Sequence, residues 1–475
     1  MITRRKCVRL LLVTCSTIVL VAVLRSNIRK HDTKHVFVSG ASGHYQNVSS
    51  NEICRNVSHN QNVFQMAEDP SKQGEDVLYA VPLATEGALF IYAAYFDERA
   101  LFSGVYVRLT GMLHRNHLDY LDRLYCHIWF PGSDEPKSAK AEGSVIWKYD
   151  AHYQAIILSC PLIRKAGGGQ HESPEAVSIS QFRCPKTGPA IRIRNGSAPN
   201  DGTVAVCTKM TYGAPDPVRL TEWIELNRIL GVRTIYLYNT SIRGEANRVL
   251  AHYSAMGVVA LRQHRFPEML SAGFLNQTFP TADYGQNWEL EILSINDCLY
   301  TATEPFLAVI DVDEILYPDR HGSLARFVAS DLVTSDEADV VSFVFHTAVY
   351  SDELEPEANN SLPWYLHTLR HNRRTRIDWE SPKSVTRRRL CLYHAHHMCF
   401  RSADGSRLRL DVDHRYGHVR HYRRRCRLTG EPNKCQKLLR NPEVDRSLDR
   451  VLPELTERVR NALVVLGLYK NAEDP

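Results

Sequence analysis

The sequence predicts an α/β protein in which a mainly parallel sheet follows a smaller β-rich domain and an N-terminal membrane anchor. Three observations predict this class. Strand-like and helix-like segments alternate between residues 204 and 310, which is typical of a parallel sheet with right-handed crossovers. Short apolar runs separated by turn residues fill residues 77–194, which indicates a β-rich module similar to a sandwich. An apolar run covers residues 10–24 near the N-terminus.

The composition is that of an ordinary globular protein. The chain has 475 residues, 44% of them hydrophobic and 23% charged, and its net charge is +5. This length allows two or three domains with substantial cores. The positive charge is too small to indicate nucleic acid as a partner.

The apolar run of residues 10–24 follows a basic N-terminus and is closed by Arg25. No small-x-small cleavage pattern follows it, so an uncleaved signal anchor is favoured over a cleaved signal peptide. The run is short, but flanking arginines can reach the interfaces of a thinner bilayer. Because basic segments stay cytosolic, the rest of the chain is expected in the lumen.

Composition divides the chain into five predicted parts. A polar stretch follows the anchor and is typical of a flexible stem, although any ectodomain spacer has the same composition. The parts are a cytosolic tail (1–9), a transmembrane signal anchor (10–24), a stem (25–76), a β-rich lumenal domain (77–198) and an α/β domain (199–475).

Cysteines and glycosylation motifs support a secretory lumen. Twelve cysteines occur, and ten follow the anchor, an even number that an oxidising compartment allows to pair. The pairing stays open, although Cys391 lies close enough to Cys399, and Cys426 to Cys435, for local bridges. Zinc ligation by cysteines is disfavoured because no C-x-x-C unit occurs. Sequons for N-glycosylation occur at Asn47, Asn56, Asn195, Asn239, Asn276 and Asn359.

The expected elements follow from periodicity and from helix end signals. In the β-rich part, strands are expected at 88–95, 105–109, 126–130, 145–149, 155–160 and 176–180, and nothing catalytic stands out there. The α/β part starts with a strand at 204–210. Asp216 and Pro217 then open a helix that Gly231 ends. The next elements are a strand at 234–238, a helix at 246–256, a strand at 258–261, a helix at 287–303 and a strand from Phe306.

The strongest chemical signal is the segment Phe306–Pro318, FLAVIDVDEILYP. Its apolar start indicates a buried strand, and Asp311 and Asp313 come where that strand ends. Buried carboxylates are costly unless a positive charge lies beside them. Ligands of α/β sheets collect at the carboxyl ends of strands, and carboxylates suit Mg²⁺ or Mn²⁺ together with phosphates. The segment therefore predicts a divalent cation that holds a diphosphate; the alternative is a turn with solvated acids.

Other phosphate-binding classes lack their motifs here. The first strand is not followed by G-x-G-x-x-G or by G-x-x-x-x-G-K-[ST], which argues against dinucleotide enzymes and P-loop NTPases. A phosphatase of the D-x-D-x-[TV] type is excluded because Ile315 occupies the Thr/Val position. A second D-x-D, Asp411 and Asp413, follows an alternating Arg-Leu segment instead of an apolar strand, so surface charge pairing is expected there.

Four ordered blocks of the sequence resemble glycosyltransferase family 92. The first two are GAPDPVRLTEWIELNRILGVRTIYLYN (213–239) and YGQNWELEILSINDCLYTATEPFLAVIDVDEILYP (284–318). The other two are PKSVTRRRLCLYHAHHMC (382–399) and GHVRHYR (417–423). In the β-rich part, YAAYFDER and ILSCPL also resemble the animal members. The segment FHTAVYSDEL (345–354) departs from the family's aromatic-glycine segment, which is expected to help form the acceptor site.

The resemblance implies a GT-A-like nucleotide-binding domain, a single-pass type II protein of the Golgi membrane, a UDP-sugar donor, Mn²⁺ and transfer with inversion. The animal members imply galactose as the sugar and a glycoprotein N-glycan as the acceptor, linked β-1,4 to a fucose or a galactose. Two alternatives stay open. The chain could transfer another UDP-sugar, or it could be a catalytically inactive ectodomain of the same fold that binds glycans.

The resemblance also implies the metal ligands. Asp311 and Asp313 are expected to bind Mn²⁺ and the diphosphate end of UDP. Glu314 is either a partner of these ligands or an ordinary turn residue. His421, which matches the family's HYR block, is expected to be a further metal ligand, and His396 is the second choice.

Five more residues are expected to contact the donor or its charge. Lys209 and Asn239 end the first two strands of the sheet, where uridine contacts are expected. Lys383 can counter the charge of the diphosphate. Gln286 and Asp297 lie before and in the helix that precedes the central strand, where they could touch the donor sugar. Helix capping or a buried hydrogen bond is an equally good interpretation of Asp297.

Inversion requires a carboxylate base that takes the proton of the acceptor hydroxyl. The favoured candidate is Glu380, since Trp379 beside it is a natural platform for sugar stacking and Lys383 follows closely. Asp352 is the second candidate, and Glu353 and Asp378 lie in the same part of the sequence.

Overall fold

The computed structural model describes residues 75–81, 83, 85, 87–99, 104–162, 173–184, 190–196, 202–266, 284–334, 339–355, 362–425 and 439–470. All of them belong to one compact unit, His59–Pro475. The predicted tail, anchor and nearly all of the stem lie outside the described residues. Within the described ranges, no helix is long and apolar enough to cross a membrane.

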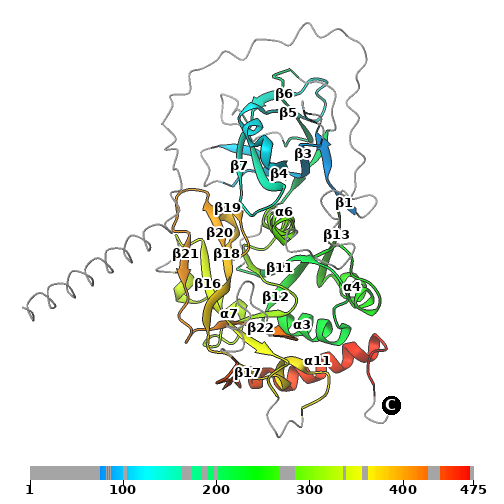
Figure 1. The fold of residues 1–475 in the computed structure, drawn as a ribbon, viewed down its shortest axis with the longest axis vertical. Helices are drawn as coiled ribbons and strands as arrows, with labels where there is room; N and C mark the ends of the chain where they lie inside the picture. The colour runs from blue at the N-terminus through cyan, green and yellow to red at the C-terminus, as the bar shows by residue number, and fades with distance from the viewer. Residues whose placement is uncertain are drawn as a thin grey trace, which may run out of the picture. The chain divides into compact units, whose positions relative to one another are not determined.

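A ten-stranded sheet forms the α/β part of the described chain (Figure 1). Its inner strands are buried along nearly their whole length, as expected for strands covered on both faces. In spatial order the strands are β1 (Glu75–Val77), β13 (Val259–Arg265), β12 (Val232–Asn239), β11 (Val204–Thr211), β14 (Phe306–Val309), β18 (Asp378–Arg387), β16 (Ser342–Ser351), β22 (His418–Arg423) and β15 (Glu314–Tyr317), and β21 (Arg409–Asp411) pairs with β16.

This sheet contains strands of both directions but is mainly parallel, as the sequence predicts, since β16 also pairs parallel with β21 and β22, and only β18 and β15 among the described strands run the other way. β13, β12, β11 and β14 run parallel, as the alternation of strands and helices predicts. Beyond β14 the direction changes, since β18 pairs antiparallel with both β14 and β16. β15 also pairs antiparallel with β22. These later strands come from residues after 310, where the regular alternation of one strand with one long helix does not continue.

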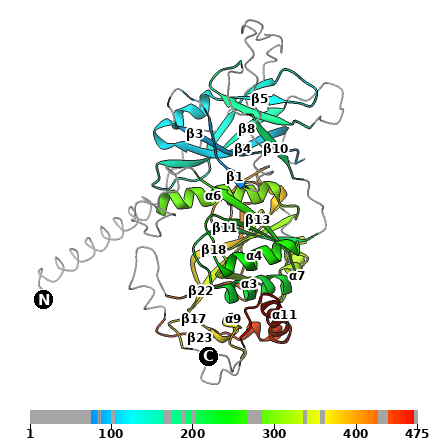
Figure 2. The same cartoon turned by 90° about the vertical axis from the view of Figure 1, so that its right-hand side faces the viewer.

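Helices cover both faces of the sheet, because successive residues of its strands point to opposite sides. Val204 and Val206 of β11 join the core formed with α3 (Pro217–Ile229) and α4 (Glu245–Ala255). Ala205 and Cys207 join the core formed with α6 (Tyr284–Thr301). α11 (Leu452–Val465) packs on α3 (Figures 1 and 2). The shorter helices are α7 (Leu324–Val328), α8 (Asp331–Thr334), α9 (His367–Arg370), η1 (Arg115–Arg123), η3 (Arg388–Leu390) and η4 (Ser447–Val451).

The start of α3 agrees with the sequence prediction. The side chain of Asp216 accepts hydrogen bonds from the backbone N–H groups of Val218 and Arg219, at 2.9 and 3.1 Å. An aspartate in this position satisfies backbone donors that the helix itself leaves unpaired. Gly231 follows the helix with φ of 84°, a conformation that glycine adopts readily.

The β-rich part is one nine-stranded, hydrogen-bonded sheet, whereas the sequence suggested a sandwich-like module. The expected strand at 145–149 is also displaced, since the observed one ends at Val145. In spatial order the strands are β6 (Lys137–Lys140), β5 (Tyr125–Trp129), β9 (Ala176–Ser180), β10 (Ile191–Asn195), β3 (Leu89–Asp97), β4 (Val105–His114), β8 (Tyr153–Leu162) and β7 (Glu142–Val145), with β2 (Tyr79–Val81) beside β3. Two small sheets pair β17 (Arg373–Arg374) with β23 (Glu443–Val444) and β19 (Cys391–His394) with β20 (Cys399–Ser402).

α6 connects the two sheets. It packs against β11 on one side and against β3, β4 and β8 on the other, and Figure 2 shows it between them. Its buried Asp297 accepts hydrogen bonds from the hydroxyls of Tyr95 and Tyr238, both at 2.8 Å. Arg194 of β10 also contacts this carboxylate, at 2.6 Å. Asp297 therefore joins the β-rich sheet to the α/β sheet.

Three disulfides lie among the described residues. One is the local bridge between Cys391 and Cys399 that the sequence allowed. The other local candidates, Cys426 and Cys435, lie outside the described residues. The remaining two bridges join β5 to β8 and β11 to α6, through Cys126–Cys160 and Cys207–Cys298.

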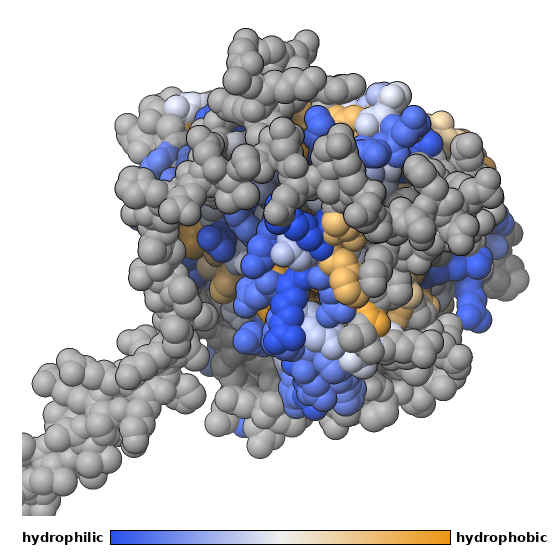
Figure 3. All heavy atoms as spheres, turned by 90° about the horizontal axis from the view of Figure 1, so that it is seen from above, coloured by the Kyte–Doolittle hydropathy of each residue, from blue (hydrophilic) through white to orange (hydrophobic). Residues whose placement is uncertain are grey.

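One face of the molecule is drawn in Figure 3. The described residues on this face are mainly hydrophilic, and the apolar ones form small groups between them. Isolated apolar residues are normal on a protein surface. This face therefore offers no argument for a large apolar docking surface among the described residues.

Candidate active site

Asp311 and Asp313 lie in the turn between β14 and β15. The backbone N–H of Glu314 donates to the carbonyl oxygen of Asp311 at 3.0 Å, which closes the turn. The backbone N–H of Asp311 in return donates to the side chain of Glu314 at 2.9 Å. The apolar residues of β14 are buried, as the sequence predicts, and the acids follow where the strand ends.

Two lysines from the strands on either side of β14 reach Asp311. β11 lies parallel to β14 and supplies Lys209, whose Nζ is 3.0 Å from Oδ2 of Asp311. β18 lies antiparallel and supplies Lys383, whose Nζ is 3.1 Å from the same oxygen and 2.6 Å from Glu314. The strand register thus places positive charge beside the strand-end acids.

His421 lies opposite Glu314 in the pairing of β22 with β15. Its Nε2 is 3.4 Å from Asp313 and accepts a hydrogen bond from Nε of Arg423 at 2.9 Å. An accepting Nε2 carries a lone pair, so the ring proton is on Nδ1. Nδ1 faces Glu314 at 3.4 Å. One ring nitrogen of His421 thus faces Asp313 and the other faces Glu314, whose second carboxylate oxygen binds Lys383, so Glu314 is a partner of these residues.

Asp311, Asp313 and His421 border a pocket of about 680 Å³. This volume is typical of pockets that hold small molecules or cofactors. Half of the Asp313 side chain is exposed, so its carboxylate is accessible from the pocket. The lining contains Lys209, Asp311, Asp313 and His421, and it also contains Arg219, Glu222, Glu291, His367, Arg423, Arg424 and Arg425.

Electrostatics keep Asp311 ionised. Burial by itself would raise the pKa of this carboxyl, but Lys209 and Lys383 lower it well below its usual range. Lys209 shows the reciprocal effect. Burial by itself would lower its pKa, but the carboxylates of Asp311 and Glu291 raise the pKa well above its usual value. The pairs therefore remain charged at neutral pH.

Glu291 is a pocket residue that sequence reasoning missed. It lies on α6, and its carboxylate is 3.3 Å from Nζ of Lys209 and 3.1 Å from Nδ1 of His396. His396, the second candidate for a metal ligand, is therefore engaged with Glu291 and with the carbonyl oxygen of Trp288. A glutamate on an otherwise apolar helix face was the available signal.

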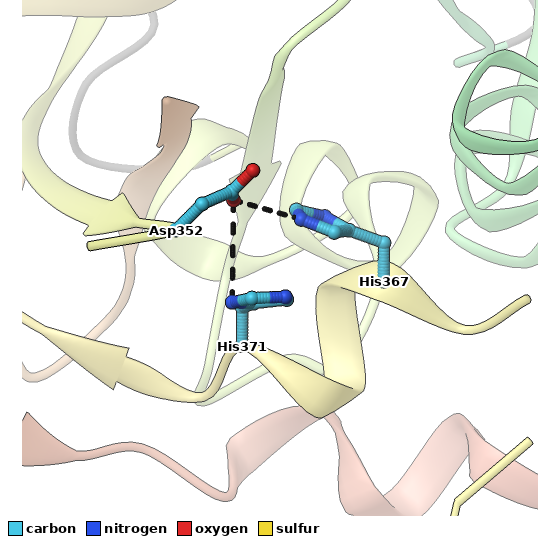
Figure 4. A group of neighbouring side chains, drawn as sticks. All are labelled: Asp352, His367 and His371. Atoms are coloured by element: carbon cyan, nitrogen blue, oxygen red, sulfur yellow. Dashed lines mark hydrogen bonds and ion pairs between the residues drawn. The ribbon is translucent and has the colours of Figure 1, made fainter. Parts of the chain in front are cut away.

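We call Lys209, Asp311, Asp313, Glu314, Lys383 and His421 the carboxylate end of the site. A second group, which we call the imidazole end, comprises Asp352, His367 and His371, which Figure 4 shows, together with Arg219. Arg219 and His367 line the same pocket, whereas Asp352 and His371 lie behind them.

At the imidazole end, one carboxylate joins three basic side chains. Oδ2 of Asp352 is 2.7 Å from Arg219, and Oδ1 is 2.9 Å from Nε2 of His367. Burial would raise the pKa of Asp352, but its hydrogen bonds to His367 and Arg219 lower it overall. Burial lowers the pKa of His371 to about 4, so this imidazole is neutral at physiological pH.

Glu222 of α3 lies near this end and was also missed from the sequence. Its carboxylate accepts hydrogen bonds from the backbone N–H and the hydroxyl of Thr368. Burial raises its pKa to about 7 even though Thr368 opposes the shift. Its partner is 146 residues away in the chain, so no sequence pattern indicates the contact.

The structure does not bring three predicted donor residues into the pocket lining. The side chain of Asn239 accepts a hydrogen bond from the backbone N–H of Ile242 at 2.7 Å and is buried. The amide of Gln286 is bound to both backbone groups of Tyr153. Asp297 is used by the contact between the sheets. For Asp297 the buried hydrogen bond is thus the better interpretation. Asn239 makes a local hydrogen bond after its strand, and Gln286 bonds to the β-rich sheet.

The structure describes the side chain of only one of the two favoured candidate bases, Asp352. The side chain of Glu380 lies outside the described part of the structure, and its backbone belongs to β18. Asp352 is bound by Arg219 and His367.

The second D-x-D is a surface feature as expected, since Asp411 pairs with Arg409 and Asp413 pairs with Arg415.

The carboxylate end fits a hard divalent cation. Oδ2 of Asp313 lies 3.4 Å from Nε2 of His421, close enough for both atoms to bind one cation, and Asp311 lies on the same turn. The carboxylate oxygens suit Mn²⁺, which usually also binds phosphate oxygens and accepts a single added imidazole such as that of His421. The arginines and lysines around the pocket match the negative charge of a diphosphate.

The fold and this site define an α/β protein whose pocket suits a divalent cation and a diphosphate-bearing ligand. The comparison with protein families identifies the chain more closely. The model of glycosyltransferase family 92 matches residues 202–456, which is more than half of the chain. The chain therefore belongs to glycosyltransferase family 92. No curated protein matches the sequence significantly.

Two solved structures are similar at a low level. TarS of S. aureus, in complex with UDP, has 8% identity and a TM-score of 0.25, with 55% of this chain and 72% of that one covered. The mannosyltransferase PcManGT of Pyrobaculum calidifontis, in complex with GDP-Man and Mn²⁺, has 11% identity and a TM-score of 0.25, with 58% and 80% covered. Similarity at this level supports no conclusion about the donor or the metal of this chain.

Proposed function

We propose that this chain is an inverting glycosyltransferase that moves galactose from UDP-galactose to a glycan of a glycoprotein, with Mn²⁺ at Asp311 and Asp313. The observation that carries the proposal is the Asp311–Asp313 turn flanked by Lys209 and Lys383 on a pocket of about 680 Å³. Family membership supports the reaction class. Galactose and the N-glycan acceptor are supported by the resemblance of the sequence blocks to animal members.

The carboxylate end would bind the donor. Asp311, Asp313 and His421 would hold Mn²⁺, which when bound supplies positive charge to the diphosphate leaving group. Lys209 lines the pocket beside Asp311 and can donate to a phosphate oxygen. Lys383 is nearly fully buried against Glu314, so its role is to neutralise and fix the acids.

The arginines after His421 extend this positive surface. Arg423, Arg424 and Arg425 line the pocket next to the carboxylate end. Arg423 now donates to the Nε2 of His421, the same nitrogen that would face the ion. We expect Arg423 to exchange this contact for a phosphate oxygen when the donor binds, since guanidinium groups match phosphate geometry.

We assign the acceptor base to Glu380. Phe345 of β16 pairs with Lys383 of β18, but Thr347 pairs with Asp378, so β18 bulges between these pairs. Ser381 in this bulge has φ of 54°, an uncommon conformation for a residue other than glycine. Bulges are frequent next to active sites, and the backbone of Glu380 belongs to this one, close in sequence to Lys383.

Asp352 fits the role of base less well, because its carboxylate is engaged by Arg219 and His367 and its pKa is low. Glu222 is a further carboxylate on the pocket. The variants Glu380→Gln and Glu222→Gln separate them. The assignment predicts that Glu380→Gln lowers kcat while the KM for the donor changes little, whereas Glu222→Gln keeps most of kcat. The reverse pattern would move the base to Glu222.

The sequence also supports a type II protein of the Golgi membrane, with residues 10–24 as the anchor and the catalytic part in the lumen. Protease protection of tags at the two ends, in intact microsomes, tests this orientation. The proposal predicts that a tag at the C-terminus is protected and that a tag at the N-terminus is digested. The opposite pattern would contradict it.

A screen of UDP-sugars with the purified full-length chain tests the reaction itself. The proposal predicts that UDP-galactose is the preferred donor, that EDTA stops transfer, and that linkage analysis finds a β-linked galactose. Preference for another sugar would leave the transferase reaction in place and correct the donor. The absence of both transfer and donor hydrolysis with every sugar would favour an inactive protein that binds glycans.

A further inference from the structure

The imidazole end contains a cluster that the proposed transfer reaction does not use. Asp352 follows the end of β16, His367 begins α9, and His371 follows the end of that helix. The backbone N–H of His371 donates to the carbonyl oxygen of His367 at 3.0 Å, so the two histidines are four residues apart on one helical turn. Figure 4 shows both rings beside the carboxylate of Asp352.

We propose that Asp352, His367 and His371 form a second metal site in this protein, one that binds Zn²⁺. Each residue offers one ligand atom, and the three atoms lie within 4.8 Å of one another. Oδ1 of Asp352 is 2.9 Å from Nε2 of His367 and 4.0 Å from Nδ1 of His371. Ligand atoms of a tetrahedral zinc ion, at about 2.0–2.2 Å from it, lie roughly 3.3 Å apart. Small side-chain adjustments therefore suffice.

One nitrogen of this cluster, Nδ1 of His371, makes no hydrogen bond among the described residues. This nitrogen is also buried. Its nearest charged neighbour is the same oxygen of Asp352 that accepts the proton of His367. A buried polar atom without a partner is costly, and a metal ion between the three ligands would satisfy it. Binding at Nε2 of His367 would move the ring proton from this nitrogen to Nδ1.

The chemistry of the ligands selects the metal. Two of the three ligands are neutral imidazoles, which suit Zn²⁺, whereas Mg²⁺, Ca²⁺ and Mn²⁺ prefer oxygen ligands. Arg219 already neutralises the charge of Asp352 through Oδ2, so the site attracts a cation mainly by imidazole lone pairs. Arg219 also fixes the carboxylate, with Oδ1 left on the side of the histidines.

The position of the site gives it access to the pocket. His367 lines the pocket, while Asp352 and His371 are largely buried behind it. Three protein ligands leave one position of a tetrahedral ion open, as in zinc sites that bind water or a substrate oxygen. None of the three ligands belongs to the carboxylate end, so the site does not depend on the proposed donor.

Metal counting on the full-length chain tests the proposal. In an Asp313→Asn background, which weakens the carboxylate end, protein stripped with a chelator is titrated with Zn²⁺, and bound zinc is counted by mass spectrometry. We expect one zinc per chain, and we expect His371→Ala in that background to weaken zinc affinity by at least about 100-fold, more than the loss of a supporting residue does. The exposed His414, which lies beside Asp413, provides the matched control, and His414→Ala should bind zinc as the background does.

Two further measurements keep the test decisive. Circular dichroism shows whether His371→Ala is folded. If that variant does not fold, His371→Cys, which replaces one zinc ligand by another, is used in its place and should bind zinc. Visible absorption of Co²⁺ in place of Zn²⁺ should report a tetrahedral site in the background and lose that signal with His367→Ala. Equal zinc affinity with and without His371, or no zinc binding in the Asp313→Asn background, would show that Asp352 and His367 are only a hydrogen-bonded pair. UDP binding by the wild-type chain is measured separately. The result of the zinc test therefore neither supports nor contradicts the donor proposal.

Discussion

The two ends of the pocket place ionisable groups together in different ways. At the carboxylate end, Asp311 and Glu314 each meet a lysine within 3.1 Å, and Asp313 lies 3.4 Å from Nε2 of His421. At the imidazole end, one carboxylate meets an arginine and two neutral histidines. The first arrangement offers oxygen ligands and charge, which suit Mn²⁺ and a diphosphate, whereas the second offers nitrogen lone pairs. The same pocket therefore borders two sets of side chains whose ligand atoms suit different metal ions.

The largest expected effect is at Asp313. Replacing it by Asn keeps the shape of the side chain but removes a charged ligand. We expect transfer to fall by about 10³-fold or more, since a catalytic metal contributes several kcal/mol to the transition state. The matched control is Asp413→Asn in the surface D-x-D, which should keep wild-type turnover. Similar turnover of the two variants would contradict the role of Asp313.

Lys383 tests the energetics of the same end. It is almost fully buried with Glu314, so Lys383→Met leaves a carboxylate that has lost a partner. We expect a loss of about 3–5 kcal/mol in unfolding free energy, measured by urea denaturation. The double variant Lys383→Met/Glu314→Gln removes both charges and should recover most of this loss. An unchanged urea midpoint for the single variant would mean that the pair contributes nothing.

Glu314 tests whether an indirect partner supports the metal. Its carboxylate faces Nδ1 of His421 and binds Lys383, but it lies behind the ligands. Glu314→Gln should weaken Mn²⁺ affinity by about 10–100-fold, as measured by calorimetry with UDP present. An affinity equal to that of the wild type would assign Glu314 a purely structural role in the turn.

The smallest predicted effects compare one cation from each end. Lys209 contacts Asp311 directly, whereas Arg219 is engaged with Asp352. Lys209→Met should weaken UDP affinity by roughly tenfold, the value of one charge-assisted hydrogen bond. Arg219→Met should weaken it by less than about threefold, because surface-accessible ion pairs contribute little. A larger effect of Arg219 would place the diphosphate at the imidazole end.

The sequence predicts local features of the carboxylate end because they depend on neighbouring residues. The apolar residues of β14 before Asp311, the cap of α3 at Asp216 and the parallel strands β11, β12 and β13 all follow from short-range patterns. Lys209 was also expected, because the end of a parallel strand is where ligands collect.

The remaining features depend on long-range pairing. No short-range pattern indicates that β18 and β15 run opposite to the other strands, and the register of β22 against β15 decides that His421 meets Glu314. Arg219 and Asp352 are 133 residues apart, so no spacing indicates their contact. Gln286 and Asp297 were expected at the donor because their helix precedes the central strand, but the β-rich sheet packs on that side and uses them.

Calorimetric titration of UDP into the full-length chain tests the central claim most directly. The account predicts that UDP binds in the presence of Mn²⁺, that EDTA abolishes this binding, and that Asp313→Asn abolishes it while Asp413→Asn does not. Equal UDP affinity with Mn²⁺ and with EDTA, or unchanged affinity in Asp313→Asn, would contradict a metal-dependent donor site at the Asp311–Asp313 turn.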